Sequence, residues 1–354
     1  MLIFHTADIH LNSNLKSNLD DKKALIRRDE IKNNFYNLIS LAETQKADFF
    51  IIAGDMFDTE TGIVRLKNQF LDIISEHPEI KFLYVNGNHD ESSFLNDDVP
   101  PNFYIFRRNW TYFNFDNITF AGRSVPVKPA DNYFNDLELD ANRTNIVVLH
   151  GDITLSNNND TDYAINLNSL KGKNIDYLAL GHRHDFEQGR IDNRGNFAYP
   201  GALDGRGFDE IGPKGYITID DSIVPTFHKF NSREYEIVYT DISNSKTESD
   251  IISLLKEKIK NINTSSLVKI VLTGEVDISL RRDTNYISSQ INSDHFFIKI
   301  EDKTKIKIDF NSLMSDISIK GEFLRLVNES EEIDSNIKDD VMLIGIKALE
   351  GEDF

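Results

Sequence analysis

Five short apolar runs in the first half of the chain predict buried strands. Each run is nearly continuous rather than alternating, which is typical of a strand that is covered on both faces. The runs span residues 2–4, 49–53, 82–85, 146–149 and 177–180. The stretches between the first three runs place apolar side chains three or four residues apart, as in an amphipathic helix. Alternating strands and helices indicate a layered α/β domain.

Later segments modify this pattern. Residues 103–140 are rich in aromatic side chains around an Asp116-Asn117 turn signal and predict a β-hairpin or meander. With a further strand at 215–219, we expect a sheet or sandwich of mixed strand direction. Beyond a boundary near 229–234, the pattern predicts a small α+β unit with strands at 235–239, 267–272 and 296–300 and helices at 247–262 and 283–292. From residue 319, apolar side chains (Ile333, Ile337, Val341, Ile344, Ala348) again recur at helical spacing.

Composition excludes several kinds of site. The 354 residues contain no cysteine, which excludes disulfides, thiolate zinc sites, iron–sulfur clusters and a cysteine nucleophile. No apolar stretch approaches the roughly 18–20 residues of a membrane helix, and the N-terminus does not resemble a signal peptide. We therefore expect a cytoplasmic protein without a membrane partner. The net charge of −19 predicts repulsion from nucleic acid unless a basic patch, a metal or a partner supplies attraction.

A polar group that can bind metal follows each of the five apolar runs. In layered α/β sheets, ligands gather at the carboxyl ends of strands, so these groups can converge on one cleft. A single histidine is more often a satisfied core residue than a ligand, but five of the nine histidines fall at these strand ends beside Asp or Asn. The candidate ligands are Asp8, His10, Asp55, Asn88, His150, His182 and His184.

Seven ligands exceed one metal site and suit two, with a carboxylate, most naturally Asp55, shared between them. Imidazole and carboxylate ligands without thiolate favour Mn, Fe or Zn over Mg alone. Two ions about 3.5–4 Å apart can neutralise the oxygens of a phosphoryl group, so the predicted reaction class is phosphoester hydrolysis.

The motifs Asp8-x-His10, Gly54-Asp55, Gly87-Asn88-His89-Asp90, His150-Gly151 and Gly181-His182-x-His184 resemble those of the calcineurin-like metallophosphoesterase superfamily. The segments 6–11, 54–58, 199–202 and 206–210 are similar, more narrowly, to the SbcD-type DNA repair exonucleases, bacterial relatives of the meiotic-recombination-eleven nuclease. The resemblance is dense over residues 1–220. It implies a layered β-sandwich flanked by helices at 1–230, a small α+β capping domain at 231–310, and a C-terminal helical segment at 311–354 that docks on an ATPase.

The resemblance also implies roles for single residues. One ion would be bound by Asp8, His10, Asp55 and His184, and the other by Asp55, Asn88, His150 and His182. His89 would stabilise the transition state or give a proton to the leaving oxygen. The two divalent ions would be Mn²⁺, with Mg²⁺, Fe²⁺ or Zn²⁺ as alternatives.

Residues around these motifs have weaker assignments. Arg183 and Arg206 are candidate substrate contacts, and Asp90 and Asp152 are expected to orient neighbouring histidines. Asn12 stands where the family usually has glycine, which Asn can replace in a turn that needs positive φ. Asp58 stands where some related nucleases carry histidine.

We therefore predict a DNA exonuclease with some single-strand endonuclease capacity that acts in DNA repair or recombination. By resemblance it is a homodimeric subunit of an SbcCD-like complex with an SbcC-like, SMC-family ATPase. The chain has no G-x-x-x-x-G-K-[ST] loop, so any ATP dependence comes from that partner. One alternative is a general metallophosphoesterase for nucleotides or phosphoproteins. The other is a non-catalytic scaffold that binds DNA or the ATPase.

Overall fold

The computed structural model divides the chain into two units, Met1–Glu236 and Ile237–Phe354. It describes residues 1–15, 19–58, 63–90, 94, 98–124, 134–155, 163–277, 280–291, 295–307, 314–315, 317–335 and 337–350. Among these residues, no helix is both long and apolar enough to cross a membrane.

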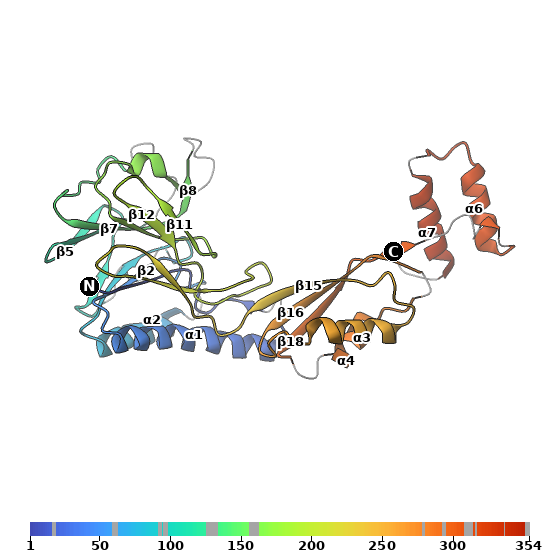
Figure 1. Ribbon diagram of the computed structural model, residues 1–354, viewed down its shortest axis with the longest axis horizontal. Coiled ribbons are helices and arrows are strands. Elements are labelled where there is room, and N and C mark those ends of the chain that lie inside the picture. The colour runs from blue at the N-terminus through green and yellow to red at the C-terminus, as the bar shows by residue number, and fades with distance from the viewer. Residues whose placement is uncertain are drawn as a thin grey trace. The chain divides into compact units, whose positions relative to one another are not determined.

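The first unit contains two six-stranded sheets of mixed direction packed face to face (Figure 1). The first sheet has the order β14-β13-β1-β2-β3-β4, in which β1 to β4 are parallel and β13 and β14 are antiparallel additions. Its strands are β1 (Ile3–Thr6), β2 (Phe49–Ala53), β3 (Lys81–Val85), β4 (Phe103–Ile105), β13 (Gly215–Ile219) and β14 (Thr226–Lys229).

The second sheet has the order β11-β12-β10-β7-β6-β5, with parallel central strands and an antiparallel strand at each edge. Its strands are β5 (Thr111–Phe115), β6 (Ile118–Gly122), β7 (Thr144–His150), β10 (Tyr177–Gly181), β11 (Glu187–Arg190) and β12 (Asn196–Tyr199). The expected mixed sandwich and the hairpin at Asp116-Asn117 are both confirmed.

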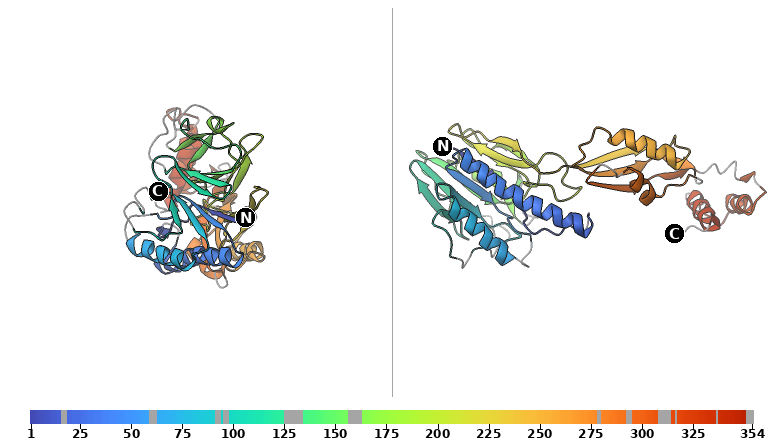
Figure 2. Two further views of the ribbon diagram at one scale, coloured as in Figure 1. Left: turned by 90° about the vertical axis from the view of Figure 1, so that its left-hand side faces the viewer. Right: turned by 90° about the horizontal axis from the view of Figure 1, so that it is seen from below.

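Helices cover the outer face of the first sheet. These are α1 (Asp21–Thr44), whose first turn is capped by the Asp20 carboxylate, and α2 (Ile63–Glu76) (Figure 2). The outer face of the second sheet packs on a short 3-10 helix, η2 (Leu167–Leu170), near the paired strands β8 (Asp152–Thr154) and β9 (Ala164–Asn166).

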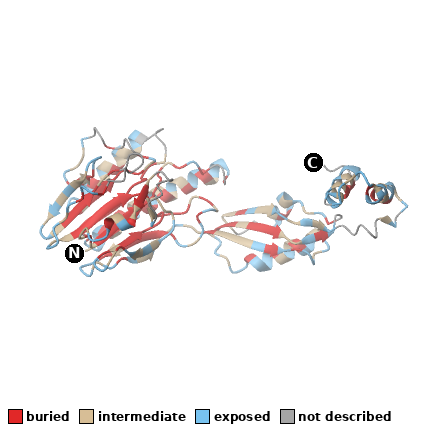
Figure 3. Cartoon of the chain, turned by 90° about the horizontal axis from the view of Figure 1, so that it is seen from above, coloured by how far each residue is buried: buried red, intermediate tan, exposed pale blue. Residues whose placement is uncertain are grey.

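The two faces of each central strand explain its continuous apolar sequence. On β2, Phe49, Ile51 and Ala53 point into the core between the sheets. The alternate residue Phe50 faces α1, where its ring lies 6.4 Å from that of Phe35. Both faces are therefore buried, as Figure 3 shows for the strands of this unit.

The second unit has its own core, formed by a three-stranded sheet and two helices. The sheet is β15 (Tyr235–Asp241), β16 (Leu267–Thr273) and β18 (Phe297–Asp302); the helices are α3 (Glu248–Ile259) and α4 (Thr284–Ile291); and β17 (Glu275–Asp277) pairs with β19 (Lys305–Lys307). Thr247 and Asp250 close a capping box at the start of α3.

The tail forms two helices, α6 (Ile319–Glu329) and α7 (Lys338–Glu350), which pack on each other. Ser330 has an extended backbone and ends α6, so Ile333 lies in the turn between the helices rather than in a helix. The helical spacing expected through Ile333 is therefore wrong at this point, because polar residues that favour turns interrupt it. Residues 278–279, 292–294, 308–313, 316, 336 and 351–354 of the predicted capping and tail segments lie outside the described part, and these include the last residue of the helix expected at 283–292. The separation of 231–310 from 311–354 as two domains stays a prediction.

Candidate metal centre

All seven candidate ligands lie at the carboxyl ends of the central strands. Asp8 follows β1, Asp55 follows β2 and Asn88 follows β3 in the first sheet. In the second sheet His150 ends β7, and His182 and His184 follow β10. The Asp8 amide donates to Gly54 O over 3.1 Å, and the His150 ring is 2.8 Å from Ala53 O, which joins the strand ends within and between the sheets.

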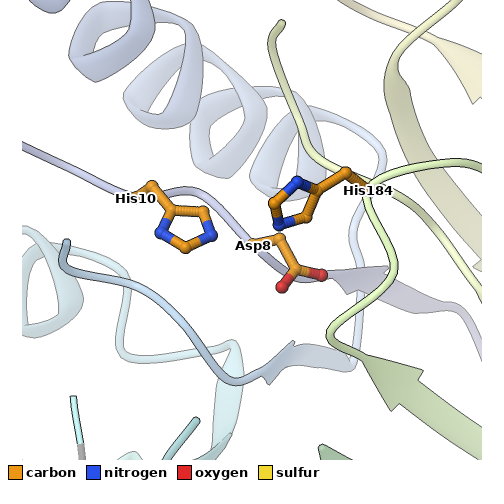
Figure 4. Close-up of side chains that lie close together, drawn as sticks. All are labelled: Asp8, His10 and His184. Carbon is orange, nitrogen blue, oxygen red and sulfur yellow. The ribbon is translucent and has the colours of Figure 1, made fainter. Parts of the chain in front are cut away.

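The first metal group consists of Asp8, His10 and His184, whose ligand atoms lie within 4.8 Å of one another (Figure 4). Asp8 and His10 are buried, and His184 is partly buried. The buried Nε2 atom of His10 makes no hydrogen bond within the described part of the chain. A buried imidazole nitrogen without a partner fits a metal ligand, because it would otherwise be left unsatisfied.

The second metal group consists of Asp55, His150 and His182, also within 4.8 Å. Asn88 joins this group, since its Oδ1 atom lies 3.0 Å from His150 Nε2 and 3.1 Å from His182 Nδ1. One carboxylate, one amide oxygen and two imidazoles converge here, and this donor set suits a divalent transition metal.

Asp55 connects the two groups. Its Oδ2 atom lies 3.4 Å from His150 Nε2 in the second group and 3.7 Å from His10 Nε2 in the first. Its other oxygen accepts a hydrogen bond of 2.9 Å from the His89 amide. One carboxylate oxygen therefore faces ligands of both groups, as a bridging ligand must.

Hydrogen bonds orient the histidines. A carbonyl oxygen can only accept, so the Nδ1 atom of His150 donates to Ala53 O, and its Nε2 atom is directed toward Asn88 Oδ1 at 3.0 Å and Asp55 Oδ2 at 3.4 Å. The Nδ1 atom of His10 likewise donates to Asp58 Oδ1 over 3.1 Å. Partners of this kind fix the tautomer of metal-binding histidines and aim the other nitrogen at the ion.

The charges of the site call for a cation. Burial raises the pKa of Asp8 to about 7 and lowers that of His10 to about 4. Burial also opposes ionisation of Asp55, but the neighbouring His150 outweighs it and holds the pKa of Asp55 well below its ordinary value. In turn Asp55 overcomes the effect of burial on His150 and raises its pKa to about 9. The raised pKa of His150 reflects the negative charge of Asp55, and a divalent ion, which binds only the neutral imidazole, would replace the His150 proton as the positive charge there.

The backbone at the centre is held in the left-handed region. Positive φ occurs at Asp8 (51°), His10 (49°), Asp55 (49°) and His182 (104°). Such conformations cost about 1–3 kcal/mol each in non-glycine residues and cluster at functional sites. Asn12 has φ 69°, which confirms the expectation that it occupies a turn of this kind.

Two glycines allow the strand ends to approach closely. A Cβ atom on Gly87 would lie 2.1 Å from Asp55 Oδ1, and one on Gly54, where φ is 88°, would lie 2.3 Å from His150 Nδ1. Any side chain at either position would displace a candidate ligand.

The carboxylates around the centre have different tasks. Asp152 Oδ2 lies 3.5 Å from His182 Nε2, as expected of a group that orients this histidine. The same expectation for Asp90 is wrong. Its carboxylate accepts hydrogen bonds from Tyr84 Oη (2.7 Å) and from the amides of Met56 (2.8 Å) and Gly87 (2.6 Å), so both of its oxygens are occupied by donors that are not histidines.

Glu210 is a residue of the site for which the sequence indicated no role beyond its place in a motif. Its Oε1 atom lies 2.8 Å from His184 Nδ1, and its side chain is buried. The contact is made across a loop, so no local spacing could have revealed it.

The two candidate substrate-binding arginines lie beside the centre, and both are paired with carboxylates. Arg183 donates to Asp152 over 2.9 Å and also contacts Glu187. Arg206 donates to Glu210 over 2.8 Å. His89 is more open, with 43% of its side chain exposed and Nδ1 3.5 Å from Asp58.

Comparison with known proteins finds a family match and distant relatives. The family model described as calcineurin-like phosphoesterase matches residues 1–186. A subunit of the nuclease SbcCD from Staphylococcus epidermidis is 24% identical over 322 residues, 77% of this chain and 79% of the relative. Uncharacterized metallophosphoesterase YhaO of Bacillus subtilis is 22% identical over 300 residues, 77% of this chain and 72% of the relative.

A third relative is the DNA double-strand break repair protein Mre11 of Saccharolobus solfataricus, 22% identical over 310 residues, 80% of this chain and 77% of the relative. Among solved structures, TT1561 of Thermus thermophilus matches with a TM-score of 0.42 and 13% identity, over 65% of this chain and 98% of that one.

Proposed function

The chain belongs to the calcineurin-like phosphoesterase family, and we propose that it is a two-metal nuclease that hydrolyses phosphodiester bonds at DNA ends. The observation that carries the two-metal part is the position of Asp55 Oδ2 between His10 Nε2 at 3.7 Å and His150 Nε2 at 3.4 Å. One carboxylate facing both groups is the arrangement that two adjacent ions require.

In this proposal each ion has four protein ligands. Asp8, His10, Asp55 and His184 hold one, and Asp55, Asn88, His150 and His182 hold the other. We propose Mn²⁺ for both, since the donors are imidazoles and oxygens without thiolate. Bound there, divalent ions would supply positive charge for the phosphoryl oxygens and make water a better nucleophile at neutral pH.

His89 is the proposed catalytic residue of the chain itself. Its imidazole is partly exposed at the edge of the centre, so it can reach a bound phosphodiester. Its amide is held by Asp55, which fixes the loop that carries the ring. From this position the imidazole can donate a proton to the leaving oxygen.

DNA is the proposed substrate because two relatives are named for action on DNA and their alignments extend beyond the family match at residues 1–186. Two relatives are named as a nuclease and a DNA double-strand break repair protein, and their alignments cover 77% and 80% of this chain, well beyond residues 1–186. In addition, Arg107 and Arg108 are exposed just after β4, at the same sheet edge as Asn88. They are candidates for contact with the phosphate backbone.

The proposed partner is an SMC-family ATPase that binds the C-terminal helices. One relative is named as a subunit of SbcCD. On α6, Ile319 and Leu326 lie seven residues apart on one face and are 72% and 62% exposed. Ile344 of α7 is also exposed. An ATPase that supplies DNA-binding surface would offset the repulsion expected from a net charge of −19. Homodimerisation is proposed from the resemblance.

A substrate comparison tests the proposal. The purified chain is assayed with Mn²⁺, Mg²⁺ and Zn²⁺ on linear duplex DNA, single-stranded DNA and a small chromogenic phosphodiester, with His89→Ala as control. We expect Mn²⁺-dependent cleavage of DNA that the variant loses. Hydrolysis of the small ester alone would instead indicate a general phosphoesterase. Failure on all substrates, with the variant indistinguishable from wild type, would indicate a scaffold.

A further inference from the structure

We propose that Arg206 is a positioning residue that holds the two histidines of the first metal group in place, through one carboxylate on each side. The inference rests on the metal-binding part of the proposed function and does not depend on DNA being the substrate. It assigns Arg206 a role other than the substrate contact that the sequence suggested.

On one side, Arg206 is fixed to Glu210 at three points. Its backbone amide donates to Glu210 Oε2 over 2.9 Å, and its Nη2 and Nε atoms lie 2.8 and 3.2 Å from Oε1. The same Oε1 atom lies 2.8 Å from Nδ1 of His184. With only 6% of Glu210 exposed, this carboxylate has little contact with water and depends on these partners.

On the other side, Arg206 approaches Asp58. Its Nη1 atom lies 3.7 Å from Asp58 Oδ1, the atom that accepts a hydrogen bond from His10 Nδ1 over 3.1 Å. The second Asp58 oxygen accepts from Ser13 Oγ over 2.9 Å. A continuous chain of contacts therefore runs from His184 through Glu210, Arg206 and Asp58 to His10.

This chain of contacts explains how the imidazoles face the ion site. Because Nδ1 of His10 and Nδ1 of His184 each meet a carboxylate, Nε2 is the nitrogen of each ring that can face an ion. Arg206 also contacts the His184 ring directly, with Nη2 3.2 Å from Nδ1 and 3.5 Å from Nε2. The two rings stand nearly perpendicular, at 80°, with centroids 5.2 Å apart. The guanidinium between Asp58 and Glu210 reduces the repulsion of the two carboxylates and sets their separation.

Arginine suits this task better than substrate binding here. Its planar fork can contact two carboxylates at once, whereas the point charge of lysine cannot keep both geometries. Only 15% of the Arg206 side chain is exposed, which leaves little of it for a phosphate. The second metal group has a different support, since His150 donates to the carbonyl of Ala53, so loss of Arg206 is expected to affect one ion and not both.

Titration with Mn²⁺ alone, without DNA, tests the inference. Isothermal titration calorimetry and electron paramagnetic resonance are applied to wild type, Arg206→Gln, Arg206→Lys, Glu210→Gln and the control Arg194→Gln. Arg194 makes a two-point pair with Asp176 at 2.9 Å, away from the centre, so its loss removes an equivalent ion pair. We expect two sites in wild type and in the control. In both Arg206 variants and in Glu210→Gln, we expect one site weakened about 10- to 100-fold and the other unchanged.

Other results would overturn the inference. If Arg206→Gln and Glu210→Gln bind both ions as wild type does, and Arg206→Gln only raises KM for DNA, Arg206 is a substrate contact. Should Arg206→Gln fail to fold, the nearly isosteric Glu210→Gln decides alone. A wild-type chain that binds no Mn²⁺ overturns the inference together with the metal site. A chain that binds two ions but leaves DNA uncut refutes only the proposed substrate.

Discussion

Asp55 Oδ2 lies 3.4 Å from His150 Nε2, with both side chains buried, and this contact ties the first sheet to the second. Because the same oxygen faces His10, replacing the carboxylate by an amide would remove the ligand that the two proposed ions share. We predict that Asp55→Asn retains at most one Mn²⁺ per chain and loses about 10²–10⁴-fold in kcat, the effect of several kcal/mol of lost charge stabilisation. Metal content by mass spectrometry of the desalted protein and phosphodiesterase kinetics measure the two effects.

Folding must be separated from metal loss in that experiment. Trp110 is the chain's single tryptophan and packs against the core on the outer face of the second sheet, so its fluorescence reports on the first unit. If Asp55→Asn keeps the wild-type emission, two bound ions and full activity, Asp55 is not the shared ligand.

A second prediction separates catalysis from metal binding at His89. The His89 amide donates to Asp55 Oδ1, and alanine keeps that amide while removing only the imidazole. We therefore expect His89→Ala to bind both ions but to lose about 10²–10⁴-fold in kcat, the usual size of a general acid's contribution. If metal content falls instead, the ring supports an ion rather than the leaving group. A substrate with a better leaving group, which needs no proton, should show a smaller loss.

The strands and the grouping of the candidate ligands could be predicted for one physical reason. Phe49 and Phe50 are adjacent in sequence yet face opposite layers, and burial on both sides produces a continuous apolar run that is visible in the sequence. Polar residues such as Asp55 at the end of a buried run have no role in the core, so their presence there indicates a site. The parallel direction of neighbouring strands then brings these ends to one edge of the sandwich.

What could not be predicted depends on contacts between distant loops. Glu210 reaches His184, and Asp90 turns toward Met56 and Tyr84, through side-chain directions that no periodicity records. Local patterns indicate whether a residue is buried, but they do not specify which loop closes over an edge. The carboxylates around the ligands were accordingly the least predictable part of the site.

A third prediction concerns the buried pair of Arg27 and Asp204. The two side chains are 0% exposed and lie 2.7 Å apart, Nη2 to Oδ1, joining α1 to the loop that leads to Glu210. Removing the cation leaves a buried carboxylate without its ion partner, so we expect Arg27→Met to lower the free energy of unfolding by about 3–5 kcal/mol. Urea unfolding followed by Trp110 fluorescence measures this. The control Lys32→Ala breaks the exposed pair with Asp29 on the same helix and should cost less than about 1 kcal/mol.

A matched double variant tests the reason for that loss. In Arg27→Met with Asp204→Asn, the buried charge is removed as well, so part of the lost stability should return. If the double variant is as unstable as the sum of the single variants, the cost comes from packing around Arg27 and not from an unpaired carboxylate.

The last prediction is a pH dependence at Glu30, which receives hydrogen bonds from Arg27 and Arg233. Burial opposes its ionisation, but these hydrogen bonds outweigh burial and hold the pKa of Glu30 below its ordinary value of 4.5. The unfolded chain then takes up a proton at higher pH than the folded chain does. The stability that Glu30 contributes is therefore complete above about pH 4.5 and is lost as the pH falls through the lowered pKa.

We expect the difference in unfolding free energy between wild type and Glu30→Gln to be largest near pH 7 and to shrink toward pH 3, measured by urea unfolding with Trp110 fluorescence. Glu76→Gln, at an exposed position on α2, serves as the control for removing one carboxylate. A constant difference for Glu30→Gln would show that the two arginines stabilise the fold by packing and not by their charge.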